Sequence, residues 1–102
     1  MRRGEVWWYE HPDAGRRPFL VLTRDPAIEV LTQVLAVPAT TTIRDIPTEV
    51  VLDTDDGMPT RCALTLDTVT VVRPALCTRR ITRLSPARMA EVCAALQVAA
   101  DC

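Results

Sequence analysis

The chain has no lysine and only three glycines, one histidine and four cysteines among its 102 residues. With so little glycine, the Walker and Rossmann phosphate loops, which need several glycines at fixed spacing, are absent. His11 is the single histidine, so no Ser-His-Asp arrangement is available, and we expect it to be a solvated loop residue rather than a general base. Cys62, Cys77, Cys93 and Cys102 form no C-x-x-C pair, which argues against a zinc site. We therefore expect neither a metal nor a cofactor.

Long apolar runs are also missing. No stretch approaches the length needed to cross a membrane, and no signal-peptide pattern precedes the first expected strand. Together with the free thiols, this favours a cytoplasmic protein without a membrane partner. The net charge of −1 and the isoelectric point near 5.7 argue against non-specific coating of nucleic acid. A local basic groove stays possible, because all twelve basic residues are arginine, a bias that genome base composition explains equally well.

The apolar share of 48% over 102 residues predicts one domain, 1–102, with a real core. Ser85 as N-cap and Pro86 at the first helical position predict a terminal helix. We expect Met89, Val92, Cys93 and Leu96 on its buried face. Pro38 is expected to end the third strand. Alternating or continuous apolar runs predict short strands over 4–9, 19–24, 31–37, 47–52, 62–66, 69–72 and 79–83. The fold class is mainly β with a C-terminal helix, built as a small, strongly bent sheet or barrel.

Two arginines stand where a loop turns into an apolar strand. Pro18 fixes its own φ and favours an extended backbone at Arg17. The planar guanidinium group of Arg17, next to Arg16, presents a fork of donors that suits phosphate. The alternative is that both are ordinary solvated charges ahead of a strand.

Arginines near hydroxyl groups are the remaining chemistry in this sequence. Arginine binds phosphate bidentately, and threonine hydroxyls both donate and accept hydrogen bonds. Such a set could bind a phosphodiester or stabilise the charge that develops when it is cleaved. RNA carries its own nucleophile, the 2′-hydroxyl, so a metal-free site needs only positioning, charge stabilisation and proton transfer. Composition alone favours a simpler interpretation, a Thr-rich loop with a few surface arginines. The residues concerned are Arg16, Arg17, Thr23, Arg24, Thr40, Thr41, Thr42 and Arg44.

Six short motifs, in order and at compatible spacing, give the chain a family resemblance over nearly its whole length. They are Arg3-Gly4-Glu5-Val6-Trp7, Gly15-Arg16-Arg17-Pro18 with Leu20-Val21-Leu22, Val37-Pro38-Ala39-Thr40-Thr41, Ile46-Pro47-Thr48-Glu49-Val50, Leu66-Asp67-Thr68-Val69 and Leu84-Ser85-Pro86-Ala87. Through them the chain resembles the MazF/PemK family of toxin endoribonucleases.

The resemblance implies an SH3-like small barrel of the CcdB/MazF/PemK type, working as a homodimer. It implies the toxin of a type II toxin-antitoxin system that cleaves single-stranded RNA (messenger, transfer or ribosomal) at a short sequence without a metal. The products would carry 2′,3′-cyclic phosphate and 5′-hydroxyl ends. A cognate antitoxin would block the RNA groove with an acidic, flexible segment.

The resemblance also assigns roles to individual residues. Arg17 and Thr40 are the implied catalytic pair. By its chemistry, Arg17 stabilises the phosphorane, is a poor base and could donate a proton to the leaving oxygen, while Thr40 holds a non-bridging oxygen or orients the 2′-hydroxyl. Thr41 could stand in for Thr40, and the group that removes the 2′-hydroxyl proton stays open. The implied RNA-binding residues are Arg16, Thr23, Arg24, Thr41, Thr42, Arg44, Asp67 and Thr68.

Departures from the family pattern leave the cleavage sequence and other functions open. Thr68 stands where relatives often have Gln or Asn, and Arg24 where several have Asn, so specificity does not carry over. The alternative function is a non-catalytic CcdB-like toxin that poisons DNA gyrase and depends on the last helix residues, 99–102. A fold relative that only binds nucleic acid is a third possibility.

Overall fold

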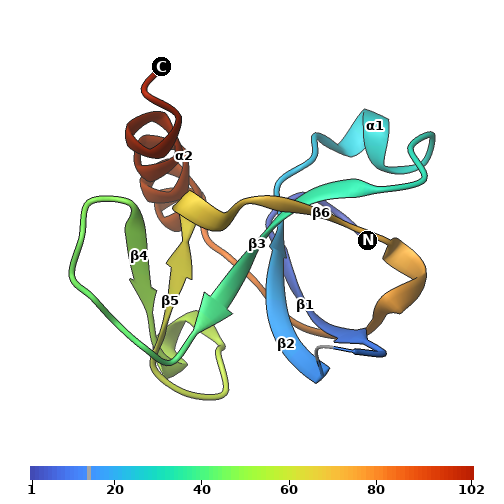
Figure 1. The fold of residues 1–102 in the computed structure, drawn as a ribbon, viewed down its shortest axis with the longest axis horizontal. Helices are drawn as coiled ribbons and strands as arrows, with labels where there is room; N and C mark the ends of the chain where they lie inside the picture. The colour runs from blue at the N-terminus through green and yellow to red at the C-terminus, as the bar shows by residue number, and fades with distance from the viewer. Residues whose placement is uncertain (14) are drawn as a thin grey trace.

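The computed structural model describes residues 1–13 and 15–102. Its sheet has the strand order β4-β5-β3-β2-β1-β7, with β6 paired to β3, and every pair is antiparallel. A long helix follows the last strand (Figure 1). The strands are β1 (Glu5–His11), β2 (Gly15–Val21), β3 (Val34–Thr40), β4 (Glu49–Leu52), β5 (Cys62–Thr65), β6 (Thr70–Val72) and β7 (Cys77–Arg83); the helices are α1 (Asp25–Ile28) and α2 (Pro86–Ala100), with short 3₁₀ turns η1 (Thr54–Asp56), η2 (Leu66–Thr68) and η3 (Pro74–Leu76). The predicted fold class, mainly β with a C-terminal helix, is confirmed.

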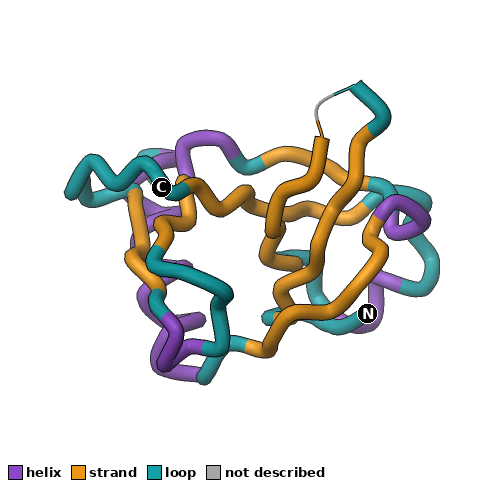
Figure 2. The backbone as a smooth tube through the Cα atoms, turned by 90° about the horizontal axis from the view of Figure 1, so that it is seen from below, coloured by secondary structure: helices purple, strands orange, loops and turns teal. Residues whose placement is uncertain are grey.

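Strand β3 joins the two parts of the sheet. Its first half pairs with β6, from Val34 to Ala36, and its end pairs with β5, at Ala39 and Thr40. The sheet therefore bends at β3, and in Figure 2 the strands follow one another around a curved surface. The prediction that Pro38 ends the third strand is wrong, as are the expected bounds 31–37. One edge of β3 pairs first with β6 and then with β5, and Pro38 lies between these two regions. Its missing N–H therefore breaks no ladder bond along this edge.

The hairpin of β1 and β2 is longer than predicted. His11 pairs with Gly15, and the ladder continues through Tyr9↔Arg17 to Val6↔Leu20. The second strand therefore begins at Gly15 rather than at residue 19. Arg16 and Arg17 are strand residues, and because successive strand side chains alternate, they point to opposite faces of the sheet.

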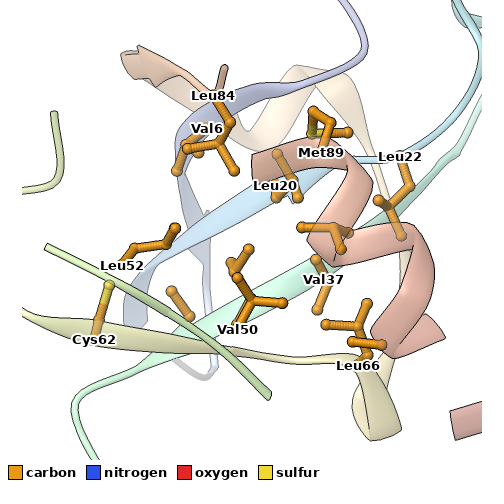
Figure 3. Packing of buried hydrophobic residues seen from close by; sticks show 14 of the residues in the cluster. Val6, Leu20, Leu22, Val37, Val50, Leu52, Cys62, Leu66, Leu84 and Met89 are labelled. Carbon is orange, nitrogen blue, oxygen red and sulfur yellow. The ribbon is translucent and has the colours of Figure 1, made fainter. Parts of the chain in front are cut away.

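Helix α2 covers one face of the sheet and closes the larger of two apolar clusters. Figure 3 shows Met89 of the helix over side chains from β1, β2 and β3, among them Val6, Leu20 and Val37. Burying each such side chain contributes about 1.5–3 kcal/mol. The predicted helix face is right for Met89 and Val92, whereas Cys93 is exposed and Ala95 is buried in its place. The smaller cluster lies on the other face of the sheet, around Val21, Ile28, Val34, Ala36 and Val72. Among the described residues, no helix is both long and apolar enough to cross a membrane.

An ion pair ties α2 to the β4–β5 connection. The Arg88 guanidinium donates from Nε to Asp56 Oδ1 at 2.9 Å and from Nη2 to Asp56 Oδ2 at 3.2 Å. Burial alone would raise the pKa of Asp56, but the hydrogen bonds from Arg88 and from the Asp53 N–H hold that pKa below its ordinary value. The hydrogen bonds that Arg88 donates to Asp56 and Glu91 raise the pKa of Arg88. This contact therefore stabilises the fold most where Asp56 is ionised.

Candidate active site

A pocket of about 440 Å³ opens where the first residues of β2 and β4 meet the last residues of β3 and β5. Its wall brings together side chains that are widely separated in sequence. Five of them are residues for which the sequence predicted a role. The lining residues are Arg17, Thr40, Arg44, Ile46, Glu49, Thr65, Asp67 and Thr68.

Strand register explains why Arg17 and Thr40 share this pocket. Phe19 of β2 pairs with Pro38 of β3. Two residues further along each antiparallel strand, Arg17 and Thr40 come to the same level, and residues two apart lie on the same face of a sheet. Both side chains line the pocket. The sheet thus sets a guanidinium group and a hydroxyl group beside each other.

The Thr40 hydroxyl is oriented by the chain that follows it. Its Oγ1 accepts the Thr42 N–H at 3.2 Å, so its own proton stays available for a ligand in the pocket. Thr41 lines a separate cavity of about 220 Å³ with Trp8, Pro18 and Pro59, among others. Of the two neighbouring threonines, the structure places Thr40, not Thr41, beside Arg17.

The pocket carries two cations and two carboxylates. None of the ion pairs found within 1–13 and 15–102 involves Arg17 or Arg44, so both guanidinium groups can bind an incoming anion. Asp67 accepts the Thr48 hydroxyl at Oδ2, at 2.6 Å. Glu49 accepts the Arg44 N–H at Oε1, at 2.9 Å, while its Oε2 is buried and has no partner among the described residues. The formal charge of the lining side chains is zero.

A pair of hydroxyls forms the wall that continues from β5 into η2. Thr65 Oγ1 and Thr68 Oγ1 lie 2.7 Å apart, and Thr68 also donates to the Thr65 carbonyl at 3.0 Å. Thr65 reaches Pro38 O of β3 at 3.4 Å. These bonds hold Thr68 and the adjoining Asp67 at the mouth of the pocket, where donors and acceptors for a nucleobase edge are available.

Five of the eight predicted RNA-binding residues do not line the pocket: Thr41 and Thr42, described above, and Arg16, Thr23 and Arg24. The Arg16 guanidinium group sits 4.0 Å from the centre of the Trp8 ring and 4.0 Å from Glu10 Oε1. Thr23 is buried, and its Oγ1 accepts the Leu35 N–H at 2.7 Å, so it is committed to holding β3. Arg24 is exposed immediately before α1. Neither Thr23 nor Arg24 lines the pocket, and Thr42 contributes only through its bond to Thr40.

Sequence reasoning assigned no role to three pocket residues. Glu49 pairs with Thr65 across β4 and β5, and Ile46 lies on the segment that leads into β4. The sequence feature that could have pointed to Glu49 is an acidic residue at the first position of an otherwise apolar strand, Glu-Val-Val-Leu. Across 1–13 and 15–102, no three His, Cys, Asp or Glu side chains gather as potential metal ligands.

Comparison with known proteins gives consistent matches along the whole chain. Residues 2–100 match a family described as PemK-like, MazF-like toxin of type II toxin-antitoxin system. The chain is 50% identical over 101 residues to "Probable endoribonuclease MazF5" of Mycobacterium tuberculosis, covering 98% of this chain and 93% of the relative. It is 40% identical over 103 residues to "Probable endoribonuclease MazF2" of the same species, with full coverage of both.

Solved structures agree with these sequence matches. An endoribonuclease in complex with its cognate antitoxin from a mycobacterial species superposes with a TM-score of 0.89 at 25% identity, covering 99% of this chain and 95% of that one. The Mycobacterium tuberculosis toxin MazF-mt6 gives a TM-score of 0.87 at 27% identity, with 95% and 96% covered. The fold expected from the sequence is the fold of these proteins.

Proposed function

The chain belongs to the PemK-like, MazF-like toxin family of type II toxin-antitoxin systems, and on that premise we propose that it is an endoribonuclease. It cleaves single-stranded RNA in the pocket that contains Arg17 and Thr40. The observation that carries the proposal is the placement of an unpaired guanidinium group and an oriented hydroxyl group in one pocket. The endoribonuclease names of its close relatives support the same activity.

The chemistry follows from what each group can donate. The scissile phosphate lies against Arg17, which balances the charge that grows on the non-bridging oxygens as the 2′-oxygen attacks. Thr40 donates its hydroxyl proton to one of these oxygens, since its Oγ1 already accepts the Thr42 N–H. Arg44 is free to bind the same or a neighbouring phosphate. The products are a 2′,3′-cyclic phosphate and a 5′-hydroxyl, and no metal is required by this scheme.

The proposed partners are RNA, an antitoxin and a second copy of the chain. Because solved relatives include a toxin with its cognate antitoxin, we expect an acidic antitoxin segment to compete with RNA for Arg17 and Arg44 in the cytoplasm. Leu35 and Val71 are exposed and face each other across β3 and β6. This exposed apolar pair supports a homodimer. Val30 and Leu31, which precede β3 in the chain, are also exposed.

The test is cleavage of RNA by the purified protein and by two matched arginine variants. Arg17→Ala removes the pocket guanidinium group, whereas Arg24→Ala removes an exposed arginine outside the pocket. Loss of one preorganised charge donor lowers kcat by about 10²–10³-fold, so we expect this loss in Arg17→Ala and near wild-type rates in Arg24→Ala. Mapped ends should carry cyclic phosphate. Equal activity of the two variants would move the active site elsewhere.

The gyrase-poison alternative predicts a different pattern. That mode depends on the end of α2, so removing Asp101 and Cys102 would abolish toxicity, while Arg17→Ala would preserve it. An endoribonuclease shows the reverse, because these two exposed residues follow the helix and line no part of the pocket. Growth assays of both variants therefore separate the two functions.

A further inference from the structure

We propose that Glu49 is the general base of the cleavage reaction, accepting the proton of the attacking 2′-hydroxyl. The inference rests on the proposed endoribonuclease function and names a group that the sequence left undetermined. It starts from one unusual atom. Glu49 Oε2 is the single buried side-chain nitrogen or oxygen of residues 1–13 and 15–102 that has no hydrogen-bond partner.

An unpartnered buried carboxylate oxygen needs an explanation, because buried polar atoms are nearly always hydrogen-bonded. Glu49 is fixed at the first residue of β4, opposite Thr65, and its Oε1 accepts the Arg44 N–H at 2.9 Å. The carboxylate lines the same pocket as Arg17 and Thr40. The strand pairing and the Arg44 bond hold Oε1 in place, whereas Oε2 is buried without a partner among the described residues.

The chemistry of that ligand follows from charge. An ionised carboxylate only accepts hydrogen bonds, and a phosphate group, itself anionic and without a proton to give, would be repelled. The ligand must therefore bring a donor. The scissile phosphate is held by Arg17 and Thr40. The 2′-hydroxyl on the ribose that carries this phosphate is then the hydrogen-bond donor nearest to it along the RNA chain. Rotation about the terminal torsion of a glutamate is soft, so the two oxygens can exchange places between the Arg44 N–H and the pocket.

The other groups near Arg17 are less suitable as bases. Asp67 is exposed, and its Oδ2 already accepts the Thr48 hydroxyl at 2.6 Å. His11 lines a neighbouring cavity, and its Nδ1 accepts the Asp13 N–H at 3.1 Å. Arg17 has no lone pair to offer while it is protonated. Glu49 is the pocket carboxylate with a buried oxygen that has no hydrogen-bond partner among the described residues.

The step balances without a further reactant other than water. The 2′-hydroxyl proton passes to Glu49 Oε2 as the 2′-oxygen forms its bond to phosphorus. The bond between phosphorus and the 5′-oxygen breaks, and its electron pair stays on that oxygen, which takes a proton from water. Glu49 then returns its proton to solvent. The net result is a cyclic phosphate and a 5′-hydroxyl, with Glu49 regenerated.

Glu49→Gln tests the assignment, because the amide keeps the size of the side chain and an acceptor for the Arg44 N–H. The matched variant is Asp67→Asn, which neutralises the other pocket carboxylate. Single-turnover cleavage is measured across pH, together with binding of an oligonucleotide that has 2′-deoxyribose at the cleavage site. We expect Glu49→Gln to lose about 10²–10⁴-fold in rate and the acidic limb of its pH profile, with analogue binding retained. Asp67→Asn should keep that limb.

Three results would overturn the proposal. Glu49→Gln could cleave at the wild-type rate, or it could keep its rate and change the sequence cleaved, which would make Glu49 a reader of a base. Glu49→Asp, which retains a carboxylate, could be as inactive as Glu49→Gln despite a native melting temperature. Partial activity of Glu49→Asp with the acidic limb preserved supports the assignment. A wild-type protein that cleaves no RNA would instead refute the proposed function itself.

Discussion

Adding a single carbon atom at Gly57, in the variant Gly57→Ala, is expected to lower the free energy of unfolding. Gly57 ends the 3₁₀ turn η1 with φ of +88°, in the left-handed region that residues with a Cβ rarely adopt. A Cβ built at this position would lie 2.8 Å from the Cβ of Thr82 and would also overlap the Thr82 hydroxyl. Thr82 cannot easily move away, because its Oγ1 donates to the Asp56 carbonyl at 3.0 Å.

The expected cost of Gly57→Ala has two parts. Left-handed backbone at a residue with a Cβ costs about 1–2 kcal/mol. The clash of the new Cβ with Thr82 adds a cost of the kind that overpacking brings, about 1–3 kcal/mol. We therefore expect the free energy of unfolding to fall by about 2–5 kcal/mol in denaturant titrations.

Gly15 provides the matched control for this prediction. Its φ is +77°, but a Cβ there meets nothing within 4 Å, so Gly15→Ala carries only the backbone part, about 1–2 kcal/mol. Adding Thr82→Ala to Gly57→Ala removes the overlap with the hydroxyl but keeps the Cβ of residue 82 at 2.8 Å. It should therefore recover part of the loss, although Thr82→Ala alone destabilises by removing its bond to Asp56. If Gly57→Ala costs no more than Gly15→Ala, or if Thr82→Ala gives no recovery, the overlap argument is wrong.

Two further predictions concern the site and the pH dependence of stability. Thr40→Val removes the hydroxyl group with little change of shape, so kcat should fall by about 10²–10³-fold, whereas Thr41→Val should stay close to wild type in the same cleavage assay; equal losses would mean that either threonine can serve. Asp56 has a folded pKa below its ordinary value of 3.8, so its contact with Arg88 contributes stability above that value and loses it as pH falls through the lower, folded pKa. Melting temperatures of the wild type should therefore fall more steeply in acid than those of Asp56→Asn; parallel curves would contradict the assigned pKa direction.

Local signals in the sequence were sufficient for most of the fold. Ser85 and Pro86 open α2 as predicted, with Ser85 Oγ accepting the Arg88 N–H at 3.2 Å. The errors came where tertiary pairing outweighs a local preference. Pro38 breaks strands in general, but here β3 exchanges β6 for β5 at that residue. Likewise, the polar residues before Pro18 are typical of a loop in sequence. In the structure, residues 15–17 form a strand because they pair with β1.

The same contrast applies to the pocket. Arg17 and Thr40 could be named from sequence because each sits in a short motif that resembles the family. Glu49 also sits in one of these motifs, Ile46-Pro47-Thr48-Glu49-Val50, but its place in the pocket depends on pairing with Thr65 and on the Arg44 N–H, two contacts that no local pattern encodes. Thr23 shows the opposite case. A threonine hydroxyl is able to bind phosphate, which is why the sequence suggested Thr23. In the structure, however, this hydroxyl accepts the Leu35 N–H and has a structural role.

The charge balance of the pocket bears on the choice between cleaving RNA and only binding it. A protein that merely held nucleic acid would gain affinity from each arginine and lose it to each nearby carboxylate. Here Arg17 and Arg44 share the pocket with Glu49 and Asp67. The two carboxylates weaken the binding of phosphate in this pocket. In a nuclease the cations are needed where charge develops, and a carboxylate is needed where a proton leaves. The retained carboxylates therefore favour catalysis over simple binding, and they agree with an overall charge of −1, which is unsuited to holding RNA without specificity.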